Sequence, residues 1–249
     1  MLGVRRDVTL ANLSLMNTDW HLRQLRRRPI EDFDPGAAAA IWRPGSDSAG
    51  SPIGEAVAGG WVRPTTPVFD MTLEQLDSLP EITRAPEGSI VFDSLLVTVG
   101  RNYLTRSDLA TILLIRDNLG KRPIYFSWTD GNYPVETLGL GEYLISQGMV
   151  RKLNPTPVVG DGERIVLSRH HMGWLDVPRT HALLSDVYHW ESATWPRPDG
   201  WVDPPSGSIL QLYLMVYGGY ADYLMERGDM ATAAKFDSIA TAAQLNLTR

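Results

Sequence analysis

The sequence predicts an α/β fold: a mainly parallel β-sheet flanked by helices, with an added β-hairpin and a C-terminal tetratricopeptide-like helical hairpin. Apolar, β-branched runs alternate with segments of helical character between residues 7 and 153, which favours a parallel sheet. Asp161-Gly162 stands between two apolar runs, and such a pair is a strong hairpin signal. Two amphipathic segments separated by Gly228-Asp229 occupy residues 206–245, as expected of paired helices.

Each predicted element has a local reason. Residues 7–15 include apolar residues at both odd and even positions, as in a strand covered on two faces. Asn17, Thr18 or Asp19 can cap the helix that follows. Capping, breaker and β-branched residues predict the elements after it. They are a short helix at 72–76, an extended segment at 89–99, a helix at 105–118, a strand at 122–128, a helix at 141–147, a strand at 149–153 and a hairpin at 158–167.

Two regions are predicted along the chain: an α/β domain at 1–177 and a C-terminal helical region at 178–249 that packs on it. Residues 35–67 are rich in Gly, Ala, Ser and Pro, and we interpret them as an irregular excursion of the first domain rather than a linker.

The C-terminal segments at 206–227 and 230–245 have the spacing of one tetratricopeptide-like unit. One unit cannot bury its own apolar face and normally needs about three stacked copies. We therefore expect this pair to pack on the α/β body. The alternative is a peptide-binding groove that includes Tyr217 and Phe236.

Composition excludes several classes of function. The chain has 249 residues and a net charge of -6, whereas nucleic-acid binding needs a basic face that neutralises phosphates, so we predict no nucleic-acid partner. The arginines at 23 and 26–28 are interpreted as a solvated helix face. There is no cysteine, and the five histidines lack the spacing of a zinc site. Neither a phosphate-binding loop nor a nucleophile elbow is present. We therefore predict no metal and no cofactor.

Polar side chains follow two of the predicted strands, and they form our candidate ligand-binding site. Ligands of open parallel sheets bind beyond the carboxyl ends of the strands. The candidates are Asn17, Thr18, Asp19, Ser127, Thr129 and Asp130. The alternative is that these residues serve as a helix cap and a polar turn. We assign no catalytic residue.

Aromatic residues in the last third of the chain allow two interpretations. Flat apolar rings suit the faces of sugars, but aromatic residues also fill cores and anchor loops. The residues concerned are Trp174, Tyr188, Trp190, Trp195 and Trp201.

Residues 3–9, 13–20 and 22–25, together with Arg122-Pro123-Ile124-Tyr125-Phe126, carry a family resemblance. The chain resembles the soluble C-terminal region of a bacterial domain-of-unknown-function family of protein O-mannosyltransferase-like membrane glycosyltransferases of GT-C type. Further matching segments fall in the expected order over nearly the whole chain. They are Gly139-Leu140, Tyr143-Leu144, Gly148 and 153–155.

The resemblance implies a location and a role. In that family a membrane-embedded half transfers sugar from a lipid-linked donor, and the region similar to this chain lies outside the cytoplasm. The acidic catalytic residue belongs to the membrane half, which this sequence does not include. The resemblance therefore implies a non-catalytic domain at the periplasmic face of the inner membrane that supports acceptor binding or protein interaction. Its partners would be the membrane-embedded half and an acceptor protein or glycan.

A second hypothesis stays open. The chain has no stretch of roughly 18 apolar residues and no recognisable signal peptide. A free-standing α/β enzyme in the cytoplasm, acting on a small molecule or carbohydrate through the carboxylates at the strand ends, is the alternative.

Overall fold

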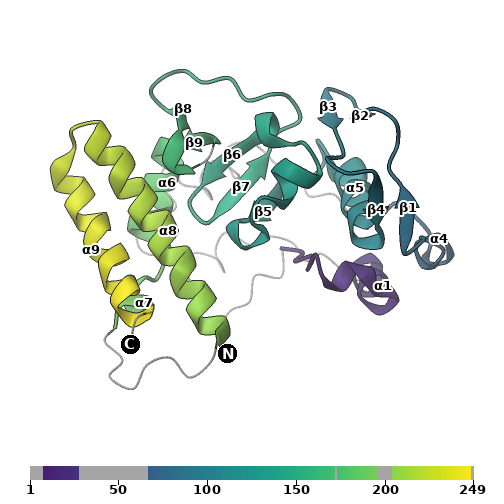
Figure 1. Ribbon diagram of the computed structural model, residues 1–249, viewed down its shortest axis with the longest axis horizontal. Coiled ribbons are helices and arrows are strands. Elements are labelled where there is room, and N and C mark those ends of the chain that lie inside the picture. The colour runs from purple at the N-terminus through teal and green to yellow at the C-terminus, as the bar shows by residue number, and fades with distance from the viewer. Residues whose placement is uncertain (1–7, 28–66, 172, 196–203, 248–249) are drawn as a thin grey trace. The chain divides into compact units, whose positions relative to one another are not determined.

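The computed structural model describes residues 8–27, 67–171, 173–195 and 204–247 (Figure 1). The excursion predicted at 35–67 lies outside these residues apart from Pro67, and so do Arg28 and Trp201. The chain divides into two compact units. Unit 1 contains Met1–Phe126, Asp130–Tyr143 and Lys152–Pro157, and unit 2 contains Ser127–Thr129, Leu144–Arg151 and Val158–Arg249.

Unit 1 combines helices with two small antiparallel sheets, β1 paired with β4 and β2 paired with β3. Its helical elements are η1 (Leu15–Asn17), α1 (Asp19–Arg27), α4 (Leu73–Asp77), α5 (Arg106–Asn118), η3 (Tyr133–Thr137) and η4 (Gly141–Tyr143), and its strands are β1 (Ile82–Arg84), β2 (Ile90–Phe92), β3 (Leu95–Val97) and β4 (Tyr103–Thr105). Its core packs α1 and α4 against α5 through buried residues that include Leu22, Leu76 and Ala110.

A five-stranded sheet has the strand order β5-β7-β6-β9-β8. Its strands are β5 (Ile124–Ser127), β6 (Leu144–Gln147), β7 (Val150–Leu153), β8 (Ile165–Ser168) and β9 (Gly173–Asp176). Strands β6 and β9 are parallel, and β8 and β9 are antiparallel. The helical elements of this half of the chain are η2 (Trp128–Asp130), η5 (Arg169–His171), α6 (Val177–Ala182), η6 (Leu183–Val187), α7 (Glu191–Thr194), α8 (Pro204–Glu226) and α9 (Met230–Leu247).

The prediction of a mainly parallel sheet is wrong. Among the described residues, β6 and β9 are the one parallel pair in a mixed sheet, and both small sheets are antiparallel. The alternation that suggested parallel strands depended partly on residues 8–14, which form no strand. Asn12 explains this difference, because its side-chain oxygen accepts the N–H of Leu15 at 3.1 Å and its carbonyl accepts the N–H of Met16 at 3.0 Å. These local hydrogen bonds direct the chain into η1, so the backbone groups that take part are not available for pairing in a β-sheet.

The hairpin predicted at 158–167 is displaced in the structure. The carboxylate of Asp161 accepts the N–H groups of Glu163, Arg164 and Ile165 at 2.7–3.0 Å, and this tight turn leads into β8. The partner of β8 is β9, not residues 158–160. Gly160 instead lies against the Trp174 ring, where a Cβ atom would come within 2.6 Å of the ring.

Two helices that the sequence predicts, at 72–76 and at 105–118, are present and begin at capping boxes. Thr105 and Asp108 form a capping box at the start of α5, and Thr72 and Gln75 form another at the start of α4. The helix predicted at 141–147 is wrong after its first turn, because Leu144–Gln147 is the fully buried strand β6. A four-residue apolar run does not distinguish a buried strand from a buried helix.

The two C-terminal helices are present as α8 and α9, which lie side by side in Figure 1. Tyr217 and Phe236 are fully buried in the core of unit 2. Gly218 allows close approach, because a Cβ atom there would lie 3.7 Å from the Cβ of Ala240. These contacts favour the predicted packing role over a peptide groove at these two residues. None of the helices in the described residues combines the length and apolar character needed to cross a membrane.

Candidate functional site

The first group of predicted site residues lies at the N-terminus of α5 in unit 1. The side-chain oxygen of Asn17 accepts the backbone N–H of Ser107 at 3.0 Å, and the carboxylate of Asp19 forms an ion pair with Arg106. The hydroxyl of Thr18 donates to the carbonyl of Leu15 at 2.6 Å. All three side chains therefore make contacts inside unit 1.

Arg106 is the centre of this cluster, although no local sequence pattern indicates its role. Its side chain is 9% exposed, and its guanidinium donates to the carbonyls of Leu76 and Asp77 at 3.1 and 3.0 Å. These carbonyls lie in the last turn of α4, where backbone donors become scarce, although the carbonyl of Leu76 also accepts the N–H of Leu79 at 3.3 Å. Arg106 thus joins the first turn of α1, through Asp19, to the last turn of α4.

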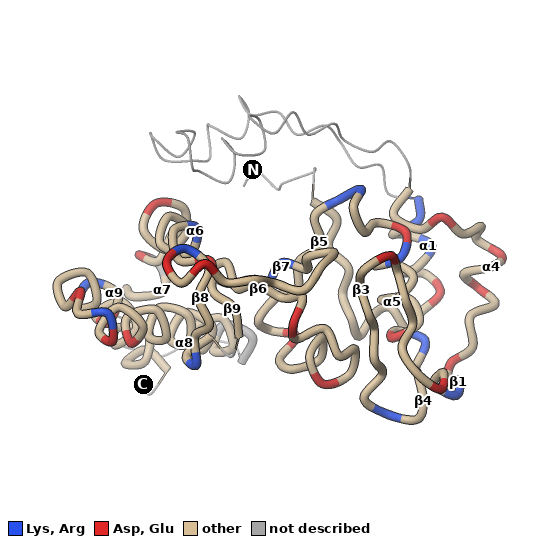
Figure 2. The backbone as a smooth tube through the Cα atoms, turned by 90° about the horizontal axis from the view of Figure 1, so that it is seen from above, with Lys and Arg blue, Asp and Glu red and all other residues tan. Residues whose placement is uncertain are grey.

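The predicted solvated face of α1 is partly used inside unit 1. Arg23 makes a bidentate pair with Asp77 at 2.8 and 2.7 Å, and its hydrogen bond lowers the pKa of that carboxyl. The Nε atom of Arg26 donates to the carbonyl of Met71 at 2.8 Å. Figure 2 shows the basic positions of α1 and the acidic positions of α4. These arginines connect two helices of one unit.

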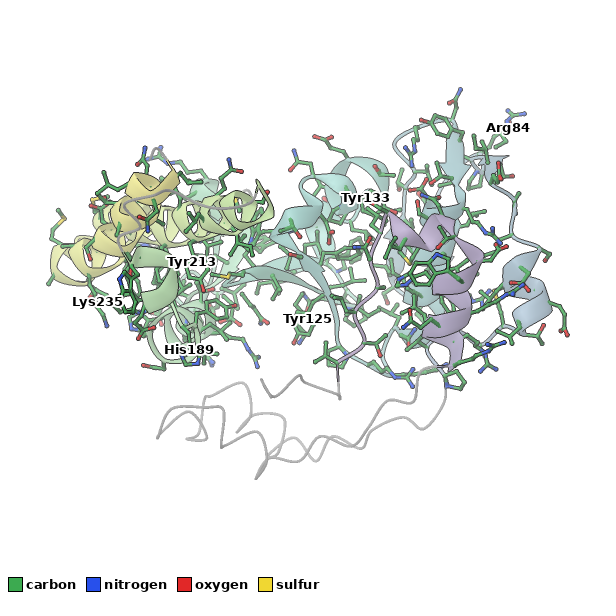
Figure 3. All side chains as sticks on the ribbon, turned by 90° about the horizontal axis from the view of Figure 1, so that it is seen from below. Arg84, Tyr125, Tyr133, His189, Tyr213 and Lys235 are labelled. Atoms are coloured by element: carbon green, nitrogen blue, oxygen red, sulfur yellow. The ribbon has the colours of Figure 1, made fainter. Side chains whose placement is uncertain are left out.

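A second buried cluster surrounds Asp108 at the same helix terminus. Its carboxylate accepts the N–H and the hydroxyl of Thr105 at 2.7 and 2.6 Å, pairs with Arg101, and accepts the hydroxyl of Tyr133 at 3.0 Å. Tyr133 is labelled in Figure 3. Burial raises the pKa of the Tyr133 hydroxyl, which therefore remains a donor. The capping-box pattern had located Asp108, but only as a helix cap.

The second group of predicted site residues follows β5. The hydroxyl of Ser127 accepts the N–H of Thr129 at 3.2 Å and its hydroxyl at 2.8 Å, which is the geometry of a local polar turn. Ser127 and Thr129 belong to unit 2, whereas Asp130 belongs to unit 1. That the six candidate residues bind a ligand stays a prediction.

Unit 2 contains an open cleft of about 610 Å³ beside β8 and the last turn of α8. Leu167, Ser168, Arg169 and Gly173 line one side of it, and Tyr223, Glu226 and Arg227 line the other. None of these residues was selected from the sequence. No local sequence pattern predicts this cleft, because its two sides are more than 50 residues apart in the chain.

Charged groups dominate the rim of this cleft. Glu226 forms an ion pair with Arg169, and its carboxylate lies 3.1 Å from Nε2 of His170. The hydrogen bond with His170, together with Arg169, lowers the pKa of Glu226. The guanidinium of Arg227 lies over the Tyr223 ring, 5.6 Å from its centroid. Such a rim can bind a ligand that carries both charge and hydrogen-bonding groups.

Ser168 forms part of the cleft wall and contacts a buried histidine. Its hydroxyl lies 3.1 Å from Nδ1 of His171. Burial, and to a lesser extent the charge of His170, lowers the pKa of His171 to about 4, so its imidazole is neutral near pH 7. The two adjacent histidines lie in the single turn η5.

Metal binding finds no support in the described part of the chain, where no group of three or more His, Cys, Asp or Glu side chains has suitable geometry. The aromatic residues have mixed surroundings. Tyr188 and Trp190 pack on the core of unit 2, while Trp195 is 71% exposed. A carbohydrate-stacking role for these rings stays a prediction.

Comparison with known proteins gave one result. Residues 67–173 match the family model described as TMEM260-associated domain 2. Neither the curated proteins nor the solved structures gave a match. The matched segment is less than half of the 249 residues and runs from just before α4 to the start of β9. Residues 67–173 are therefore similar to TMEM260-associated domain 2, a domain of unknown function.

Proposed function

We propose that this chain is a non-catalytic, extracytoplasmic soluble domain of a membrane glycosyltransferase, in which it supports acceptor binding. The partners in this proposal are the membrane-embedded half of the same enzyme and an acceptor protein or glycan. Two similarities support it: the resemblance to protein O-mannosyltransferase-like enzymes and the match of residues 67–173 to a domain whose description calls it an associated domain.

The observation that carries the binding role is the open cleft of unit 2. It is a shallow hollow, widely open to solvent, and it is bordered by the charged side chains of Arg169, Glu226 and Arg227. Orientation of a ligand by a few well-placed polar groups in a concave site is typical of binding sites. The candidate carboxylate of Asp19, by contrast, pairs with Arg106 and so helps to hold the helices of unit 1.

The test compares acceptor kinetics in the full enzyme. Arg227→Gln should raise the KM for the acceptor several-fold and leave kcat unchanged, because it removes an interaction made equally in the ground and transition states. Arg84→Gln, which changes an arginine of unit 1 whose side chain is 81% exposed, is the matched control. An unchanged KM in Arg227→Gln would refute the binding role of the cleft.

A separate assay distinguishes the two functional hypotheses. The isolated chain should show no transfer from a polyprenyl-phosphate-linked sugar, since the proposal assigns the chemistry to the membrane half. Turnover by the isolated chain that disappears in Asp19→Asn or Asp130→Asn would favour the free-standing enzyme instead. A periplasm-sensitive reporter fused to the full-length protein tests the location.

A further inference from the structure

Strand β8 is the outermost strand of its sheet, and the register with β9 fixes which of its backbone groups point outward. The N–H of Val177 donates to the carbonyl of Arg164 at 2.8 Å. In an antiparallel pair, hydrogen-bonded and non-hydrogen-bonded residues alternate. Residues 164, 166 and 168 therefore face β9, whereas Ile165 and Leu167 direct their N–H and C=O groups away from the sheet.

The chain covers one of these two residues itself. The carbonyl of Ile165 accepts the N–H groups of Asp161 and Gly162 at 3.1 and 3.3 Å, and its N–H donates to the carboxylate of Asp161 at 2.8 Å. No described residue does the same for Leu167, whose side chain is 71% exposed. An exposed, apolar strand edge is a template for pairing with another extended segment.

Leu167 brings the open edge to the cleft, and the charges of the cleft favour an acidic partner. Leu167 lines the strand side of the cleft together with Ser168 and Gly173, which pair with each other across β8 and β9. Among the described residues Arg227 has no carboxylate partner, and its guanidinium is held over the Tyr223 ring. Arg169 adds a second guanidinium, so two cations border the cleft beside the single carboxylate of Glu226.

We propose that the cleft binds an extended polypeptide segment with an acidic side chain, which pairs with the N–H and C=O of Leu167 and places its carboxylate at Arg227. This mode is the addition of a strand to a sheet edge, in which main-chain hydrogen bonds give affinity and side-chain contacts give selectivity. The inference rests on the proposed function, because it specifies the acceptor as a protein segment rather than a glycan.

The sharpest test changes one backbone donor. Leu167→Pro removes the outward N–H without removing a ladder bond to β9, and proline is tolerated at such edge positions. The probe is a short labelled peptide of alternating valine and threonine with a central aspartate, and its binding to the isolated chain is measured by fluorescence anisotropy. Binding should weaken about tenfold or more in Leu167→Pro and stay within about threefold in the matched control Leu167→Val, which keeps the N–H.

A second pair of measurements tests the preference for an acidic probe and includes a test that does not depend on whether Leu167→Pro folds. Replacing the central aspartate of the probe by lysine should weaken binding to the wild type, and Arg227→Gln should remove this preference. A probe that is N-methylated at the pairing residue tests strand addition on the unmodified protein, and it should bind about tenfold more weakly.

Three outcomes would overturn the inference. They are equal affinity of the plain and N-methylated probes, equal affinity of the aspartate and lysine probes, and self-association of the probe-free chain that disappears in Leu167→Pro. The last outcome would identify a second copy of this chain as the occupant. If the probe fails while Arg227→Gln still raises the acceptor KM of the full enzyme, the proposed function survives and the acceptor is recognised in another form.

Discussion

His171 shows how one buried side chain makes stability depend on pH. Its side chain is 4% exposed, and burial lowers its pKa to about 4 from the ordinary value of 6.5. A histidine whose pKa is lowered in the folded state makes its full contribution to the free energy of unfolding above pH 6.5. This contribution is lost as the pH falls from 6.5 towards 4, because the unfolded state then binds the proton more readily. At about 1.4 kcal/mol per pKa unit, the whole effect is about 3 kcal/mol.

His171→Gln should therefore flatten the loss of unfolding free energy between pH 6.5 and 4.5. Urea titrations at several pH values measure this slope directly. The pKa values of Glu226 and Asp161 are lowered in the folded state, and both carboxyls are present in the wild type and the variant, so the difference between the two slopes reports His171. His189→Gln, which removes an exposed imidazole, is the matched control. An identical slope in wild type and His171→Gln would contradict the prediction.

Individual residues also show which features of the structure can be predicted from the sequence. Thr105 and Asp108 are three positions apart, so a capping box is visible as a local pattern and it located the start of α5 correctly. Asn17 and Ser107 are 90 positions apart. No local pattern reports such a contact, and the polar residues around Asn17 were consequently interpreted as strand-end ligands.

At the scale of helices and strands, Arg106 predicts a measurable coupling between three helices. Arg106→Met removes the ion pair with Asp19 and leaves the carbonyls of Leu76 and Asp77 without this donor. Loss of one partner from a buried charge cluster is costly, and partial exposure of Asp19 reduces the effect. We expect a loss of about 2–3 kcal/mol of unfolding free energy, measured by urea denaturation.

A surface pair of the same chemistry provides the control for Arg106→Met. Arg84 and Glu87 lie 2.7 Å apart with side chains 81% and 86% exposed, and Arg84 extends into solvent (Figure 3). Arg84→Met should change the unfolding free energy by less than about 0.5 kcal/mol, since exposed ion pairs contribute little. Equal losses in the two variants would show that Arg106 does not link the helices.

Sheet topology was the least predictable part of the fold. The strands are three or four residues long, which is too short for a period of two to reveal how many faces are buried. The order β5-β7-β6-β9-β8 depends on contacts between segments far apart in the chain. Helices α8 and α9 were predictable because both are long, with 23 and 18 residues, and because Gly228-Asp229 marks the turn between them.

At the scale of the whole molecule, the core of unit 2 predicts how the chain can be divided. Trp128, Val166 and Leu175 pack in one buried cluster with Tyr217 and Phe236. A fragment of residues 178–249 lacks the first three of these side chains. It should retain helical circular dichroism but unfold without a cooperative transition, because its apolar faces lose their partners.

The companion experiment uses the complete chain, in which residues 178–249 should unfold cooperatively. Tryptophan fluorescence and circular dichroism, recorded during thermal unfolding, follow the two samples. A sharp, cooperative transition in the 178–249 fragment would establish the predicted region as an independent domain.

The wide separation along the chain of residues that share the core of unit 2 constrains synthesis of the protein on the ribosome. Trp128 emerges early, whereas Phe236, in the same buried cluster, is translated 108 residues later. At about 5–20 residues per second, the nascent polypeptide carries this indole without its final neighbours for roughly 5–20 s. Exposed apolar surface on that timescale attracts chaperones, and synonymous codons that slow translation before α9 would lengthen the interval.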